Sequence, residues 1–87
     1  MRLVRNTSPD LKGKYALLNL GKNTIEYGLP NTKEEFFVIK LKDKFALPAL
    51  LAYAEAVKET GDYEYAADIT ALANRAGDNS PYCKIPD

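Results

Sequence analysis

The chain has 87 residues, a formal net charge of zero, no histidine and a single cysteine, Cys83. A chain of this length forms one domain with a marginal core. The lack of histidine and of a cysteine pair argues against a tetrahedral metal site and an internal disulfide. We therefore expect a single domain over residues 1–87 without a cofactor, stabilised by assembly into a homo-oligomer.

The charges divide unevenly along the chain. Residues 1–42 carry eight basic and four acidic side chains, a balance of +4, whereas residues 43–87 carry four basic and eight acidic ones, a balance of −4. The basic half is compatible with anion binding or with pairing to the acidic half of a neighbouring subunit. No apolar run approaches the ~20 residues that span a bilayer. With no recognisable signal peptide and one cysteine, the sequence indicates a cytoplasmic protein that does not bind membranes.

The first 42 residues favour a small antiparallel β-sheet of about three strands. Residues 14–20 and 24–28 flank a tight Gly-Lys-Asn connection and are expected to pair as a hairpin. Residues 35–41 (EFFVIKL) give the strongest strand signal, because they combine aromatic and β-branched side chains without glycine or proline.

From Asp43 onward the spacing of apolar residues becomes helical. The first helical face comprises Leu47, Leu50, Leu51, Ala54 and Val57. Gly61 is suited to the left-handed residue after a helix, and Asp62 to the N-cap of a second helix over about Tyr63–Ala76. Residues 43–77 therefore predict an antiparallel helical hairpin, and residues 78–87 an extended tail packed on the body or on a neighbour. The predicted fold class is α+β.

The entrance to the first helix combines charge with a proline. With Asp43 as the cap, Pro48 falls in the second turn and predicts a kink, or a short separate turn over residues 43–46. One interpretation is that the kink turns the chain from the sheet onto a neighbouring element. The other is that freed backbone N–H groups, with Lys42 and Lys44, bind an anion. The two interpretations are compatible.

The sequence does not favour catalysis or DNA reading. Without histidine there is no Ser-His-Asp or Cys-His arrangement, and no glycine-rich phosphate loop is present. The second helix would carry three acids and only one arginine. Because the phosphates of DNA repel the acids, we expect no nucleic-acid polymer as a partner. We expect a binding protein rather than an enzyme.

Residues 35–77 resemble the helical hairpin shared by phage anti-CBASS and anti-Thoeris proteins. The matching features are the aromatic-rich strand, the Asp43-Lys44 step, Pro48 one turn later, the face formed by Leu50, Ala52, Tyr53 and Ala54, and the Gly61-Asp62 restart. They span about half the chain, and none is a catalytic signature. The N-terminal strands and the SPYCKIPD ending resemble the anti-Thoeris branch more than the mostly helical anti-CBASS branch.

This resemblance implies a non-enzymatic sponge that acts in the cytoplasm of an infected bacterial host. Members of the family assemble as hexamers and sequester cyclic nucleotide signal molecules without cleaving them. Their ligands are isomers of cyclic ADP-ribose and, in some members, cyclic di- or trinucleotides. The alternative is a small oligomeric protein-interaction module that covers a host protein with its alanine-rich face.

The candidate ligand-binding residues follow from what a cyclic nucleotide offers. Its phosphates bind Lys, Arg and backbone N–H groups, and its bases stack on aromatic rings. Arg75 beside Asn74 suits both tasks, although a favourable interaction with the helix dipole is its other interpretation. For the two lysines the alternative is a solvated strand end, and for the aromatic residues a core or interface position. The candidates are Arg75, Asn74, Lys44, Lys42, Phe45, Tyr53, Tyr82 and Tyr27.

Overall fold

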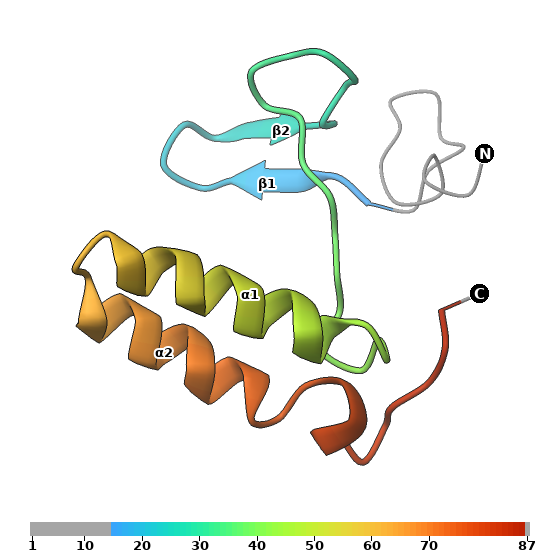
Figure 1. Ribbon diagram of the computed structural model, residues 1–87. Coiled ribbons are helices and arrows are strands. Elements are labelled where there is room, and N and C mark those ends of the chain that lie inside the picture. The colour runs from blue at the N-terminus through green and yellow to red at the C-terminus, as the bar shows by residue number, and fades with distance from the viewer. Residues whose placement is uncertain (1–14, 87) are drawn as a thin grey trace. The chain divides into compact units, whose positions relative to one another are not determined.

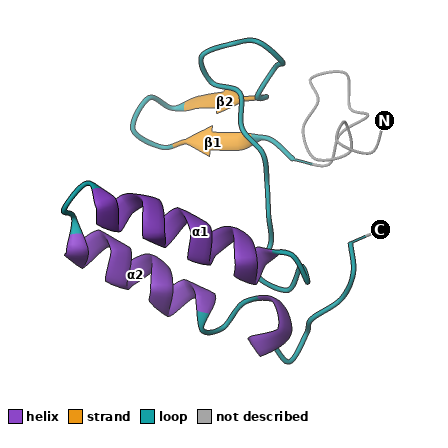
Figure 2. Ribbon diagram, in the orientation of Figure 1, coloured by secondary structure: helices purple, strands orange, loops and turns teal. Residues whose placement is uncertain are grey.

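The computed structural model describes residues 15–86 and divides the chain into two compact units, Met1–Val38 and Ile39–Asp87. The first unit contains a two-stranded antiparallel sheet, and the second contains two helices (Figure 1; Figure 2). This content confirms the predicted α+β class. The prediction of a single domain over residues 1–87 stays a prediction.

The sheet of the first unit is a short hairpin of β1 (Leu17–Asn19) and β2 (Thr24–Glu26), in which Leu18 pairs with Ile25. Asn19 closes the turn, because its Oδ1 accepts from the Lys22 amide at 3.1 Å while its Nδ2 donates to Glu26 Oε2 at 3.0 Å. The hairpin was predicted correctly, with strands longer than those observed.

The predicted third strand at residues 35–41 is wrong, since these residues form no strand in the described part of the chain. Phe36 instead packs its ring against Gly28, where an added Cβ would lie 2.6 Å from a ring carbon. At the end of the segment, the Lys40 carbonyl accepts from the Asp43 amide at 3.0 Å and turns the chain toward the helices. High strand propensity describes residues that fit a pleated surface, and within residues 15–86 no strand pairs with this segment to supply one.

The second unit is built on α1 (Ala46–Glu59) and α2 (Tyr63–Ala73), which lie side by side as an antiparallel hairpin (Figure 1). Gly61 takes the left-handed conformation with φ +87°, and Asp62 Oδ1 accepts from the Tyr65 amide at 3.1 Å. These two residues end one helix and start the next as predicted.

Small side chains form the contact between the helices. The buried apolar residues of the described chain are Ala46, Ala54, Ala66, Ile69, Ala73 and Ala76. Toward solvent, Tyr53 and Tyr65 close the seam with an edge-to-face contact of 6.2 Å between ring centroids and a hydrogen bond of 3.2 Å between hydroxyls. Alanine lets the helices approach closely but buries little apolar area, so this core is thin.

The start of α1 corrects two predictions and confirms a third, because the Ala46 amide donates to the Asp43 carbonyl at 2.9 Å and closes the predicted short turn over residues 43–46. Asp43 does not cap the helix; its Oδ1 accepts from the Phe45 amide at 2.8 Å in the turn before, and Phe45 occupies the N-cap position. Pro48 is therefore the third helical residue rather than part of the second turn. In the first turn, backbone N–H groups have no partner within the helix, so the proline removes no helical hydrogen bond and requires no kink.

The second helix ends three residues earlier than predicted, at Ala73. Beyond it, Ala76 is extended, and the amide of left-handed Gly77 donates to the Leu41 carbonyl at 2.7 Å. This bond draws the chain toward the start of α1, where a 3-10 turn follows at Gly77–Asn79. A long-range contact therefore ends the helix before the glycine that the sequence marks as its stop.

The C-terminal tail packs on its own unit, as one of the two predicted alternatives required. Lys84 forms a parallel bridge with Asp43, in which the Lys84 amide donates to Lys42 O and the Lys44 amide donates to Lys84 O, both at 2.9 Å. Residues 77–84 thus form a strap across the segment that precedes α1. Within residues 15–86, neither helix has the length and apolar character to cross a bilayer.

Candidate functional site

The predicted ligand-binding residues occupy several places. Tyr27 belongs to the first unit and the other seven to the second. Lys42, Lys44 and Phe45 precede α1, whereas Asn74 and Arg75 follow α2. Tyr53 lies within α1 and is bonded to Tyr65, and Tyr82 lies in the tail. Their binding roles stay predictions.

Lys44 already has an anionic partner. Its Nζ donates to Asp78 Oδ1 at 3.1 Å, and the same oxygen accepts a longer hydrogen bond, 3.7 Å, from the Cys83 thiol. The hydrogen bond and the opposite charge of Asp78 raise the pKa of the Lys44 ammonium above its usual value. Both partners remain in contact with solvent, so an external anion would have to compete with this carboxylate.

Arg75 bonds to its own helix. Its Nη1 donates to the Ala71 carbonyl at 3.1 Å, one of the last carbonyls of α2, which have no amide partner within the helix. This contact corresponds to the interpretation of Arg75 as a cation at a helix C-terminus.

Two predicted aromatic residues present their rings to solvent. Phe45 is 58% exposed and Tyr82 is 76% exposed. Exposed rings are available for stacking on a base or for packing on another chain. The exposure of the two rings does not distinguish stacking on a base from packing on another chain.

A shallow hollow of about 370 Å³ lies along one face of α2 and contains one predicted residue, Asn74. Its lining residues are Lys58, Tyr63, Ala66, Ala67, Thr70, Ala71 and Asn74. Those on α2 recur at steps of three and four, which places them on one helical face. Lys58 comes from the last turn of α1, which the short Thr60–Asp62 connection brings beside the start of α2.

The polar groups around this α2 hollow are chemically varied. The side chains of Lys58, Tyr63 and Asn74 have no hydrogen-bonding or ion-pair partner within residues 15–86, whereas Thr70 donates to the Ala66 carbonyl at 2.9 Å. An ammonium, a phenol ring and a carboxamide thus surround an alanine floor. Lys58 is the charged group among the lining residues, which include no carboxylate.

Sequence reasoning missed Lys58 and Tyr63 as members of a site. A signal for them existed, because Tyr63, Ala66, Ala67, Thr70, Ala71 and Asn74 recur at the helical spacing of one face. Lys58 also precedes Asp62 by only four residues in the sequence, and the tight turn between them indicates that Lys58 lies near the start of the second helix.

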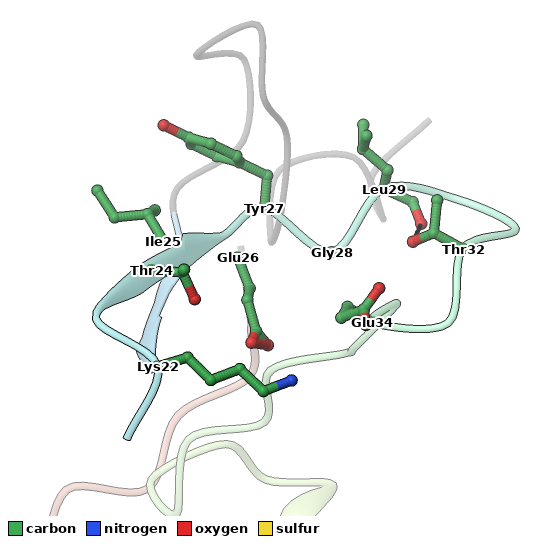
Figure 3. Close-up of a pocket in the computed structure, with 9 residues that line it drawn as sticks. All are labelled: Lys22, Thr24, Ile25, Glu26, Tyr27, Gly28, Leu29, Thr32 and Glu34. Atoms are coloured by element: carbon green, nitrogen blue, oxygen red, sulfur yellow. Dashed lines mark hydrogen bonds between the residues drawn. The ribbon is translucent and has the colours of Figure 1, made fainter. Parts of the chain in front are cut away.

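A second hollow of about 370 Å³ lies in the first unit and contains Tyr27 (Figure 3). Its charged lining residues are Lys22, Glu26 and Glu34, so carboxylates outnumber the ammonium group. Figure 3 shows the Tyr27 ring projecting away from the side on which Glu26 and Lys22 lie. This hollow is the less suitable of the two for a phosphate, which two carboxylates would repel.

No group of three His, Cys, Asp or Glu side chains is placed to hold a metal ion in the described part of the chain. No protein-family model, curated protein or solved structure matches this sequence. The functional conclusion therefore rests on the residues of this chain, and the α2 hollow is the arrangement best suited to an anionic, base-containing ligand.

Proposed function

We propose that the protein is a bacteriophage anti-defence sponge that binds cyclic nucleotide immune messengers without cleaving them, in the cytoplasm of the infected bacterial host. The ligands would be cyclic ADP-ribose isomers or cyclic oligonucleotides, and their removal would leave the Thoeris or CBASS effector inactive. The observation that carries this proposal is the α2 hollow, where an ammonium, a phenol ring and a carboxamide that have no side-chain partners within residues 15–86 surround an alanine floor.

Each group at the α2 hollow suits one part of such a ligand. The Lys58 ammonium suits a phosphate, as a point charge with three donors. The Tyr63 ring is 66% exposed and suits a base, since base–aromatic stacking contributes about 1–3 kcal/mol. The Asn74 carboxamide donates and accepts, so it suits the edge of a base. Binding of this kind requires no nucleophile or general base.

Assembly of several chains is part of the proposal, and a homohexamer is the form that the family resemblance implies. The thin alanine core of the hairpin leaves large apolar side chains uncovered in the second unit, namely Ile39, Phe45, Leu51, Tyr53, Tyr63, Tyr65, Tyr82 and Ile85. Small domains compensate for such a core by association. An open hollow would also become deeper if a neighbouring chain covered one side, which would increase burial of the ligand.

Thermal-shift measurements against a panel of cyclic ADP-ribose isomers and cyclic oligonucleotides test the proposal. A ligand at about 100 times its Kd should stabilise the fold by about 2.7 kcal/mol and raise Tm by roughly 10 °C or more. The absence of a shift with every member of the panel would refute the sponge. Denaturing a loaded sample should release intact messenger, whereas recovery of a linear product would show cleavage.

The placement of the site is tested by Lys58→Gln and Asn74→Ala. Each should weaken binding about tenfold or more, because each removes a polar partner of the ligand. Lys33→Gln removes the same charge from an exposed position outside the α2 hollow and is the matched control. Equal affinity of all three variants would move the ligand to another surface.

A protein-interaction module is the second candidate, favoured by the small residues Ala66, Ala67 and Ala71 in the floor of the α2 hollow, which would also let a partner helix approach closely. Such a partner has no need of the Lys58 ammonium. If the wild-type chain shows no thermal shift with any nucleotide and Lys58→Gln nevertheless loses function, both candidates are contradicted.

A further inference from the structure

The strap of residues 77–84 places a carboxylate on the lysine that was predicted to bind anions. Lys44 Nζ and Cys83 Sγ both approach Asp78 Oδ1, at 3.1 and 3.7 Å. Lys44 and Asp78 are 34 residues apart in sequence, so the tertiary structure brings them together. The Asp78 carboxylate therefore lies between the Lys44 ammonium and the Cys83 thiol.

Asp78 is held in place by backbone contacts. The Gly77 amide donates to the Leu41 carbonyl at 2.7 Å, and Gly77 takes the left-handed conformation with φ +54°. An added Cβ at Gly77 would lie 2.8 Å from Leu47 Cβ and 3.0 Å from the Lys44 carbonyl, so the chain passes very close to the start of α1. The entropic cost of aiming Asp78 at Lys44 is therefore largely met by the fold.

On the other side of Lys44, the backbone is fixed as well. The Lys44 amide donates to Lys84 O at 2.9 Å, and Lys84 in turn donates to Lys42 O at 2.9 Å. These bonds do not involve the Lys44 or Asp78 side chains. Separation of the ion pair would therefore leave the strap attached.

We propose that Asp78 is an intramolecular competitor for anions, which occupies Lys44 until a multiply charged phosphate displaces it. A tethered carboxylate acts at a high effective concentration, so a singly charged anion at millimolar concentration has little advantage over it. A phosphate group brings more negative charge and three acceptor oxygens, and pairs with an ammonium more strongly than one carboxylate oxygen does. Asp78 would thereby restrict this position to polyanions.

This inference goes beyond the proposed sponge, since it concerns phosphate as a chemical group and a position distinct from the α2 hollow. Inorganic pyrophosphate is therefore the probe, titrated into the full chain while backbone and lysine side-chain NMR signals are followed. The wild-type chain should show shifts at Lys44, Gly77 and Cys83 with pyrophosphate and none with acetate at equal ionic strength. Shifts confined to the α2 hollow would overturn the inference without affecting the sponge.

The decisive variant is Asp78→Asn, with Asp68→Asn as the matched control, since Asp68 is an exposed acid on α2. Removal of the competitor should tighten pyrophosphate binding by about two- to fivefold and allow acetate to shift Lys44. Asp68→Asn should leave both affinities at wild-type values. Equal affinity of the two variants would overturn the inference.

Lys44→Gln keeps the backbone bonds of the strap and provides a second test that does not depend on the behaviour of Asp78→Asn. It should abolish the shifts at Gly77 and Cys83 on addition of pyrophosphate. Retention of these shifts in Lys44→Gln would place the anion elsewhere. If a cyclic dinucleotide shifts the same residues as pyrophosphate, the phosphate comes from a nucleotide; shifts with pyrophosphate alone identify free phosphate as the ligand.

Discussion

The two units of this protein differ in how far their structure is specified by neighbouring residues. In the second unit, Gly61 and Asp62 end one helix and cap the next within two positions, so the hairpin forms from contacts close in sequence. In the first unit, the ladder joins three residue pairs, and Leu18 and Ile25 at its centre are 60% and 58% exposed. A two-stranded hairpin of this size is marginal in water. The comparison shows that local signals define the helices, whereas the strands depend on what packs against them.

Replacement of Ile69 by alanine should have the largest effect on the helical unit. Ile69 is the largest side chain in the buried set at 9% exposure, and its truncation should lower the free energy of unfolding by about 2–4 kcal/mol. Leu51→Ala is the control, because Leu51 is 47% exposed and should cost about 1 kcal/mol or less. Urea denaturation monitored by circular dichroism measures both. Equal losses would show that the hairpin is not held by its alanine seam.

Two glycines of this unit share a left-handed backbone but differ in their surroundings. Gly77→Ala should cost about 2–3 kcal/mol, because strain at positive φ adds to contacts with Leu47 and the Lys44 backbone. Gly61→Ala should cost only about 1 kcal/mol, since no atom lies within 4 Å of its added Cβ. Thermal unfolding of the two variants gives the difference. A larger loss at Gly61 would mean that the helix connection, not the strap, limits stability.

Asp62→Ala tests whether the local cap defines the second helix. Loss of the bond to the Tyr65 amide should lower stability by about 1 kcal/mol and fray the first turn of α2. Asp62→Asn retains an acceptor oxygen and should recover most of the loss. Hydrogen exchange of the Glu64 and Tyr65 amides reports the fraying directly. If both variants exchange at the wild-type rate, packing rather than capping positions the helix start.

The smallest effect is expected at alkaline pH. The hydrogen bond with Tyr53 raises the pKa of the Tyr65 hydroxyl, and Asp78 raises that of the Lys44 ammonium. For both groups, stabilisation is complete below the ordinary value and is lost as pH rises through the raised one. Stability should thus be independent of these pairs from pH 5 to 9 and decline slightly above about pH 10. NMR titration should show a lower Tyr65 pKa in Tyr53→Phe, and an unchanged value would contradict the pairing.

The parts of the fold that could be predicted are those encoded within a few residues. Gly61, Asp62 and the helical spacing carry their own signals, and the structure confirms the helices, whereas Leu51 of the predicted apolar face is 47% exposed. The segment EFFVIKL has the composition of a strand, but pairing requires a neighbour that composition does not identify. The α2 endpoint was misplaced for a similar reason, because the bond from Gly77 to Leu41 joins residues 36 positions apart in the numbering.

The same division applies to the candidate site. Asn74 could be chosen from the sequence because it stands beside the one arginine of an acidic helix, and the surrounding spacing could have added Tyr63. The carboxylate on Lys44 had no local signal, since Asp78 lies on the far side of the whole hairpin in sequence. Residue chemistry thus identified side chains suited to bind a ligand, whereas the contact of Asp78 with Lys44 became visible only in the tertiary structure.

The closure of the strap on the segment before α1 makes the helical unit a modular part. Because the Lys84 amide bonds to Lys42 O and the Gly77 amide to Leu41 O, the chain leaves this unit beside the place where it enters. Units with adjacent ends tolerate circular permutation and insertion into loops of unrelated hosts. Residues 39–86 should therefore tolerate insertion into a loop of a carrier protein. They should also tolerate circular permutation with new termini at the Thr60–Asp62 connection.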